Sequence, residues 1–159
     1  MYTRILTPLD MSELAETILP HARELARRFD AELILLHVAP SLSDMLRAAG
    51  PPTPSYVTPI PSDPQFVQQS VESALEAGNR YLDELLQKLK DEGLKARSIL
   101  AQGSAAKTIL KVCEDEDVSL IAMCTHGHSG LVRTFLGSVA DEVVRESQLP
   151  VLLLRPASS

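Results

Sequence analysis

Short apolar runs of strand length alternate with helical patterns along this chain, and that alternation constrains the fold more than any other feature. The expected strands cover residues 2–8, 30–38, 95–100, 118–123 and 150–155. Part of the second run is continuously apolar rather than alternating, which indicates a strand covered on both faces. Strands that alternate with helices predict an α/β fold: a single domain with an open, twisted, five-stranded parallel sheet and helices on both faces, of Rossmann-like type.

The segments between these runs have the spacing of amphipathic helices. Ser12 has the residue type of an N-cap for a first helix that extends to Phe29. Pro20 falls inside that pattern and is expected to kink or split the helix, because proline has no N–H and clashes with the preceding turn. A long apolar stripe predicts a helix over residues 65–92, and Gly93 is its expected C-terminal stop.

Two later helices are expected to begin at small residues, at Gly103-Ser104 and at Gly137-Ser138. The strand at residues 95–100 is weaker and more polar than the others. We therefore expect it to lie nearer an edge of the sheet, where burial is lower.

The connection over residues 39–64 differs in composition from the rest of the chain. It contains seven prolines, which leaves little room for regular structure. The patterns before and after it belong to one layered unit, so we expect one domain over residues 1–159 with a Pro-rich insertion at 39–64. So long a connection in a compact domain is either functional or mobile.

Charge and composition argue against several classes of partner. The net charge is −6 without a basic cluster, and aromatic residues make up 4%, which argues against nucleic acid and against an anionic membrane surface. No run approaches the ~20 apolar residues of a membrane span, and the N-terminal apolar run is too short for a signal peptide. Cys113 and Cys124 have no CxxC or zinc spacing, so we expect free thiols in a cytoplasmic protein.

Residues 118–139 have the pattern of an anion site. An apolar run breaks into a loop of small residues, and Gly137-Ser138 then opens a helix. Backbone N–H groups and the positive end of a helix dipole favour an anion there, phosphate above all. Ser138 could cap the helix and bond a phosphate oxygen, and Gly137 allows close approach to the backbone. The alternative is that the glycines only let the chain turn and that Ser138 is an ordinary cap.

The expected topology favours the phosphate interpretation. In open parallel sheets, ligands bind beyond the carboxyl ends of the strands, where the connection order reverses. Asp10, His37, Val38 and residues 124–130 all follow strands at such ends. His37 alone, beside an apolar run, is more typical of a packed residue than of a ligand. Together these positions predict convergence on one ligand site.

These residues resemble the universal stress proteins over nearly the whole chain. The matching segments are residues 4–10 (RILTPLD), 35–38 (LLHV), 103–104 (GS), 125–127 (THG), 136–140 (LGSVA) and 149–153 (LPVLL). The nucleotide-binding branch of that family carries Gly, two residues, Gly, nine residues, then Gly-Ser or Gly-Thr. Here nine residues separate Gly127 from Gly137-Ser138, but Cys124 occupies the first glycine position. Met11 is a second departure, because the family often has glycine there.

The resemblance implies a fold like that of the adenine nucleotide alpha hydrolases and ATP, or a related adenine nucleotide, in the crevice. Asp10 and the backbone at Val38 would line the adenine and ribose end, and the glycine motif would hold the phosphates with a divalent ion such as Mg²⁺. The implied nucleotide-binding residues are Pro8, Asp10, Val38, Cys124, Gly127, His128, Gly130, Gly137, Ser138 and Val139.

The resemblance also implies a homodimer. The last strand is apolar, and unpaired backbone groups at a sheet edge favour pairing with a second copy. Its residues Val151, Leu152, Leu153 and Leu154 are the expected contacts. The alternative is a core strand covered by the Pro-rich segment.

Cys124 leaves two structural cases open. A position that needs positive φ or very close backbone approach would make a side chain costly. A last strand residue in ordinary geometry would accept cysteine as a small apolar substitute, and we expect this second case. A thiol near a helix N-terminus could also have a lowered pKa and a redox role, but free cysteine is more often simply buried.

Three functions remain open. The favoured one is an ATP-binding (adenine nucleotide-binding) stress-response regulatory protein that signals through nucleotide state and dimer contacts. The second is a dimeric interaction protein of the same fold that binds no nucleotide. A slow ATPase is the least favoured, because the chain has no P-loop lysine, and we assign no catalytic residues. His126 and His128 provide two metal-type ligands without a third, so we assign no metal-binding residues either.

Overall fold

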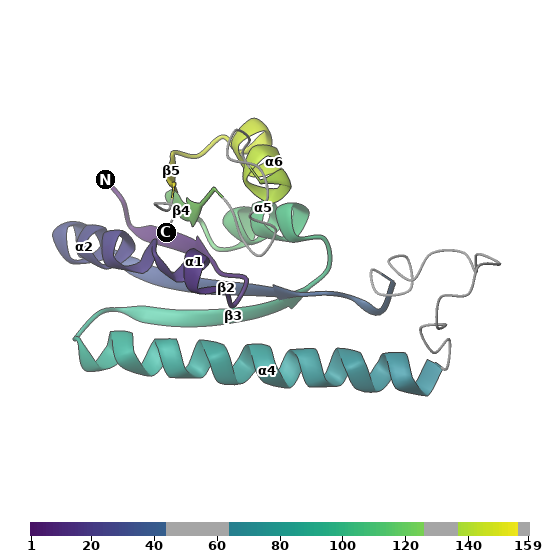
Figure 1. The fold of residues 1–159 in the computed structure, drawn as a ribbon. Helices are drawn as coiled ribbons and strands as arrows, with labels where there is room; N and C mark the ends of the chain where they lie inside the picture. Colours follow the sequence, from purple (N-terminus) through teal and green to yellow (C-terminus); the bar gives the residue numbers. More distant parts are fainter. Residues whose placement is uncertain (44–63, 126–136, 156–159) are drawn as a thin grey trace.

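The computed structural model describes residues 1–43, 64–125 and 137–155, and its strands form one parallel sheet. Figure 1 shows the sheet between two layers of helices. The elements are β1 (Arg4–Pro8), α1 (Glu13–Glu16), α2 (Leu19–Phe29), β2 (Glu32–Ala39), α4 (Pro64–Asp91), β3 (Ala96–Gln102), α5 (Ala105–Asp115), β4 (Leu120–Cys124), α6 (Ser138–Glu146) and β5 (Val151–Leu154).

The strand order is β3-β2-β1-β4-β5, with every neighbouring pair parallel. The chain therefore builds outward from β1 through β2 to β3, and then crosses back to β4 and β5 on the other side. The connection order reverses between β1 and β4, which is where such sheets open a crevice. The predicted α/β class, five parallel strands and polar edge strand β3 are confirmed.

The core has two layers because successive strand side chains point to opposite faces. On one face, Ile5 and Leu33 pack with residues of α2 and α4. On the other, Leu6 and Ile34 pack with residues of α5 and α6. All four of these side chains are fully buried, which explains why β1 and β2 have continuous rather than alternating apolar sequences.

The first predicted helix is split, as the proline in its sequence indicates. α1 ends at Glu16, and α2 begins at Leu19 with Pro20 in its first turn, where a missing N–H costs nothing. The Ser12 N-cap is confirmed, since its Oγ accepts a hydrogen bond from Ala15 N–H at 3.1 Å.

Glycine ends α4 as expected. Gly93 has φ +77°, in the left-handed region, and its N–H donates to the Lys90 carbonyl oxygen. The interpretation of Ser138 as a helix cap is wrong. Gly137 is the N-cap of α6, and Ser138 is the first residue inside the helix without a capping hydrogen bond.

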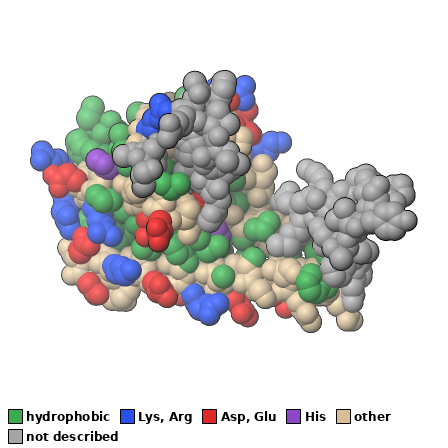
Figure 2. Space-filling view, in the orientation of Figure 1, with side chains coloured by type: hydrophobic (Ala, Val, Ile, Leu, Met, Phe, Trp, Pro, Cys, Tyr) green, Lys and Arg blue, Asp and Glu red, His purple; other side chains and the backbone are tan. Residues whose placement is uncertain are grey.

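No helix in the described ranges is both long and apolar enough to cross a bilayer. Figure 2 shows acidic and basic side chains intermixed over the described part of one face. Residues 44–63 of the predicted Pro-rich insertion lie outside the described residues.

Candidate functional site

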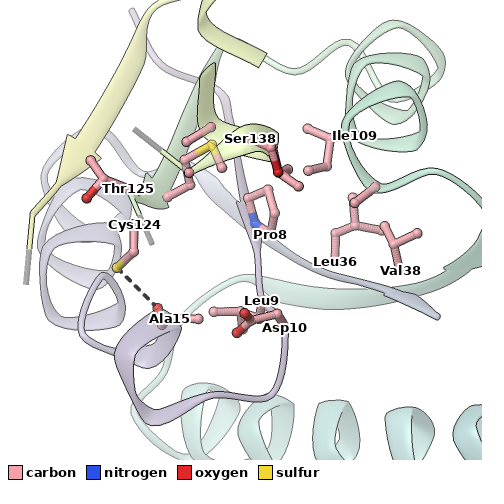
Figure 3. A pocket seen from close by; sticks show the side chains of 15 residues that line it. Pro8, Leu9, Asp10, Ala15, Leu36, Val38, Ile109, Cys124, Thr125 and Ser138 are labelled. Carbon is pink, nitrogen blue, oxygen red and sulfur yellow. Dashed lines mark hydrogen bonds between the residues drawn. The ribbon is translucent and has the colours of Figure 1, made fainter. Parts of the chain in front are cut away.

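A pocket of about 250 Å³ lies at the carboxyl ends of β1, β2 and β4, beside the N-termini of α5 and α6 (Figure 3). This is the switch point of the sheet. The lining residues are Pro8, Leu9, Asp10, Ala15, Leu36, Val38, Ala105, Ile109, Met123, Cys124, Thr125, Gly137, Ser138, Val139 and Ala140.

Most residues of the predicted site meet in this pocket. Those that line it are Pro8, Asp10, Val38, Cys124, Gly137, Ser138 and Val139. Gly127, His128 and Gly130 lie outside the described residues. The convergence follows from the parallel sheet, since β1, β2 and β4 all end at this edge.

Pro8 opens the crevice between β1 and β4. Leu9 N–H points to β2, where it donates to the Leu36 carbonyl oxygen, so the preceding residue Pro8 points to β4. Proline has no N–H, so it cannot supply a ladder bond on that side. Pairing of β1 with β4 accordingly stops at Leu6 and Ile121, whereas pairing with β2 continues to Pro8.

The two chain segments on either side of residues 126–136 are joined at the pocket. Gly137 N–H donates to the Thr125 carbonyl oxygen at 2.7 Å. Thr125 N–H in turn donates to the Leu154 carbonyl oxygen of β5 at 2.9 Å. The start of α6 is thus fixed directly beside the end of β4.

The N-terminus of α6 supplies donors to the pocket. The first hydrogen bond of the helix runs from Asp141 N–H to the Gly137 carbonyl oxygen. The N–H groups of Ser138, Val139 and Ala140, which line the pocket, precede that bond and have no acceptor within the helix. α5 presents its first residue, Ala105, to the same pocket, so two helix dipoles have their positive ends there.

The Asp10 carboxylate organises the turn that forms one wall. Its Oδ1 accepts hydrogen bonds from Ser12 N–H at 3.0 Å and from the Ser12 hydroxyl at 2.5 Å. Ser12 is also the N-cap of α1, so the carboxylate, the turn and the short helix form one connected unit. Ala15 of that helix lines the pocket.

Met11, within this turn, has φ +65°. That left-handed conformation costs a residue with a Cβ roughly 1 kcal/mol, whereas glycine adopts it freely. Met11 and Cys124 are the two positions where this chain lacks the glycine of the family. Of these two, Met11 is the one with a strained backbone.

Cys124 has ordinary strand geometry, as we expected. It ends β4 and is not among the described residues with positive φ. Figure 3 shows its sulfur directed towards α1. The thiol donates to the Leu14 carbonyl oxygen at 3.1 Å and lies 3.3 Å from the Thr17 hydroxyl oxygen. The sulfur therefore packs against α1 rather than filling the pocket.

The hypothesis of a lowered thiol pKa at Cys124 is wrong. Burial disfavours the thiolate and raises the pKa of Cys124, and this outweighs the opposing hydrogen bonds. Cys124 is 8% exposed. The buried alternative is the one the structure supports.

His37 is a packed residue, as the sequence indicated, and lies on the α4 side of the sheet. It is 5% exposed, and its Nδ1 lies 2.8 Å from the Leu9 carbonyl oxygen. Across residues 1–43, 64–125 and 137–155 no three metal-ligating side chains gather to form a metal site. His126 and His128 fall outside those ranges.

Sequence reasoning missed most of the apolar lining. These residues are Leu9, Ala15, Leu36, Ala105, Ile109, Met123 and Ala140. Ala105 could have been found, since it directly follows the predicted helix start at Gly103-Ser104. The others belong to strands or helix faces whose side-chain directions only the packing sets.

The parallel sheet and its switch-point pocket define an α/β protein of Rossmann-like architecture. The sequence model of the universal stress protein family matches residues 1–155, and the chain belongs to that family.

Among curated relatives, the chain is 31% identical to universal stress protein MJ0577 of Methanocaldococcus jannaschii over 159 residues, which cover 100% of this chain and 98% of the relative. It is also 31% identical to universal stress protein YxiE of Bacillus subtilis, over 98% of this chain and 100% of the relative. The solved structure of MJ0577 superimposes with a TM-score of 0.82 at 30% identity, covering 100% and 99% of the two chains.

Proposed function

We propose that this protein binds an adenine nucleotide in the switch-point pocket and acts as a stress-response regulator that signals through nucleotide state and dimer contacts. The observation that carries the proposal is the pocket itself. It joins apolar walls at the end of β2 to first-turn N–H groups of α6 that have no acceptor within the helix. A ligand that fits it has a flat apolar part and an anionic part, as a nucleotide does.

The base would lie at the β2 end. Leu36, Ile109 and Met123 provide apolar surface for a purine ring. The N–H and C=O of Val38 point to the side where β1 has already ended, because alternate residues of β2 face β1 and Leu36 is one of them. A backbone donor and acceptor side by side suit the edge of adenine.

The phosphates would lie at the α6 end. Ser138 and Val139 offer first-turn N–H groups, Ser138 adds its hydroxyl, and Gly137 has no Cβ to obstruct approach. By resemblance, Gly127, His128 and Gly130 would complete this end, and Cys124 would border it. A divalent ion such as Mg²⁺ would accompany a triphosphate and neutralise part of its charge.

Two more distant members of the fold were solved with adenine nucleotides. A universal stress protein structure in complex with cAMP matches with a TM-score of 0.59 at 14% identity. An Arabidopsis thaliana family protein with AMP bound also matches with a TM-score of 0.59, at 16% identity. They motivate testing AMP and cAMP beside ATP.

The direct experiment is calorimetric titration of the purified protein with ATP, AMP and cAMP in the presence of Mg²⁺, together with mass spectrometry of released small molecules. We expect saturable binding of at least one of these nucleotides and competition among those that bind. A Gly127→Val variant should lose this binding and keep its fold. Failure of all three ligands at millimolar concentration would refute the proposal.

A dimeric interaction protein without nucleotide is the second candidate. β5 forms an edge of the sheet, and Val151, Leu152, Leu153 and Leu154 are all only half-buried. We propose that two copies pair along this apolar edge. Light scattering after size exclusion should give twice the chain mass, and a Leu153→Lys variant should shift it towards the monomer.

A further inference from the structure

The hydrogen-bond ladder between β1 and β2 ends beside the pocket, and its last bond is replaced by a side-chain contact. Pro8 pairs with Leu36, and Leu9 N–H donates to the Leu36 carbonyl oxygen at 2.8 Å. In a parallel ladder, the next bond would run from Val38 N–H to the Leu9 carbonyl oxygen. That bond is not formed between these two described residues.

The His37 ring binds the Leu9 carbonyl oxygen instead. The distance from Nδ1 to that oxygen is 2.8 Å, and the ring is buried. A carbonyl oxygen can only accept a hydrogen bond, so Nδ1 must carry the hydrogen. The contact therefore selects the Nδ1–H tautomer of the neutral ring.

Helix α4 holds the ring in this position. A Cβ at Gly78 would lie 2.8 Å from His37 Cδ2, so only glycine lets the helix approach this closely. Tyr81, one turn later, meets the ring edge-on with centroids 6.4 Å apart and planes at 69°. The ring is confined between β2 and α4 with Nδ1 directed at Leu9.

We propose that His37 is a positioning residue that replaces the last backbone bond of the β1–β2 ladder and thereby keeps the Val38 N–H available to the base of a bound adenine nucleotide. The role in binding rests on the proposed function of the pocket. The replacement of the ladder bond concerns the protein alone and can be tested without ligand. A ring nitrogen acceptor of the base would take the hydrogen bond that the Leu9 carbonyl oxygen forgoes.

The first test uses ¹⁵N NMR on the protein without nucleotide. We expect the His37 ring in the Nδ1–H tautomer at neutral pH. We also expect the Val38 amide to exchange with solvent at least roughly tenfold faster than the Leu36 amide, which the ladder protects. In a His37→Phe variant the Val38 amide should become protected, because it then bonds the Leu9 carbonyl oxygen. The Nε2–H tautomer, or equal protection of Val38 and Leu36 in the native protein, would overturn the proposal.

The second test measures nucleotide affinity. His37→Phe should weaken binding of ATP roughly tenfold, the loss of about one ligand hydrogen bond. His37→Asn, whose side-chain N–H₂ can donate from nearly the same position as Nδ1, should retain most of the affinity. His21→Phe, at an exposed position in α2, is the matched control and should bind as the native protein does.

The two tests separate the possible failures. Equal losses in His37→Phe and His37→Asn would contradict the donor role. If the native protein binds no adenine nucleotide, the proposed function fails, whereas the tautomer and amide exchange still decide whether His37 replaces the ladder bond. If His37→Phe does not fold, His37→Asn and the NMR measurements on the native protein remain decisive.

Discussion

The two ends of the sheet are built from the same strands but are finished in opposite ways. At the amino end, Ser119 closes the ladder. Its hydroxyl oxygen accepts from Thr3 and Arg4 N–H groups at 2.9 and 3.1 Å, and it donates to the Arg4 carbonyl oxygen at 2.9 Å. At the carboxyl end, Pro8 and His37 stop the ladder early on both sides of β1. The amino end bonds these backbone groups internally, whereas the carboxyl end leaves the first N–H groups of α6 without an acceptor in the helix.

The amino and carboxyl ends of the sheet also differ in their charged side chains. At the amino end, Arg97 pairs with Glu32 at 3.2 Å and Glu116 at 2.6 Å, and Arg4 pairs with Asp117 at 3.3 Å. At the carboxyl end, the described residues that line the pocket include one carboxylate, that of Asp10, and otherwise have apolar, small or hydroxyl side chains. Ion pairs therefore gather at the amino end, whereas the pocket at the carboxyl end is mainly apolar among the described residues.

The largest loss of stability is expected from adding a side chain at Gly78, where α4 packs against His37 near the carboxyl end of the sheet. In a Gly78→Leu variant the Cβ alone would lie 2.8 Å from His37 Cδ2 and 2.9 Å from Leu100 Cδ1, too close for either contact. Overpacking of this kind costs about 1–3 kcal/mol or more in stability. Urea unfolding measures the loss, with exposed Asn79→Leu as the control. An unchanged midpoint would mean that α4 does not hold the ring.

The next largest effect is expected at the carboxyl end of the sheet, from a change that should raise stability but weaken nucleotide binding. Ser138→Glu places a negative charge in the first turn of α6, where the dipole favours it by about 0.3–1 kcal/mol. The same charge should repel a nucleotide phosphate and weaken binding roughly a hundredfold, about 2.7 kcal/mol. Thermal unfolding and ATP titration should therefore move in opposite directions. An unchanged affinity for ATP would show that the first turn of α6 does not contact the nucleotide phosphates.

A smaller loss of stability is expected at the amino end of the sheet. Arg97→Met removes the ion pairs with Glu32 and Glu116, whose side chains are about one-third exposed, so we expect a loss of roughly 1 kcal/mol that shrinks as salt is added. Nucleotide affinity should not change. Arg28→Met, which removes the exposed pair with Glu24, should cost less still. A drop in affinity in Arg97→Met would show that the two ends are coupled.

The smallest expected effect is a gain in stability. Met11→Gly relieves the left-handed conformation at φ +65° and should raise stability by up to about 1 kcal/mol, reduced by the greater freedom of glycine in the unfolded chain. Cys124→Gly, at a position without positive φ, should give no such gain, because it also loses the buried thiol contact with Leu14. Denaturant midpoints of the two variants compare these positions directly.

Much of the fold was predictable because its signals are local. Pro20 split the first helix and Gly93 ended α4, each through its own backbone chemistry. The position of β3 at an edge followed from its polarity. Assigning the cap of α6 to Ser138 rather than Gly137 was wrong, because glycine and serine are both common N-cap residues and the sequence does not distinguish them.

The site was predictable only in part. The parallel order brought Asp10, Val38 and Cys124 to one edge, as expected. The direction of the Cys124 thiol was not predictable, because its acceptor belongs to α1, 110 positions away in the sequence. Likewise, no local pattern reveals that α4 approaches His37 closely enough to require glycine at position 78.

The sequence by itself determined the class of fold, since apolar periodicity, proline and glycine act over a few residues and set strands, helices and their order. Tertiary structure alone decided which backbone groups stay unpaired at the pocket. That outcome depends on the alternation of the ladder between β1 and β2, on the missing N–H of Pro8, and on the ring of His37 reaching across to Leu9. These are contacts between strands, and only packing brings them together.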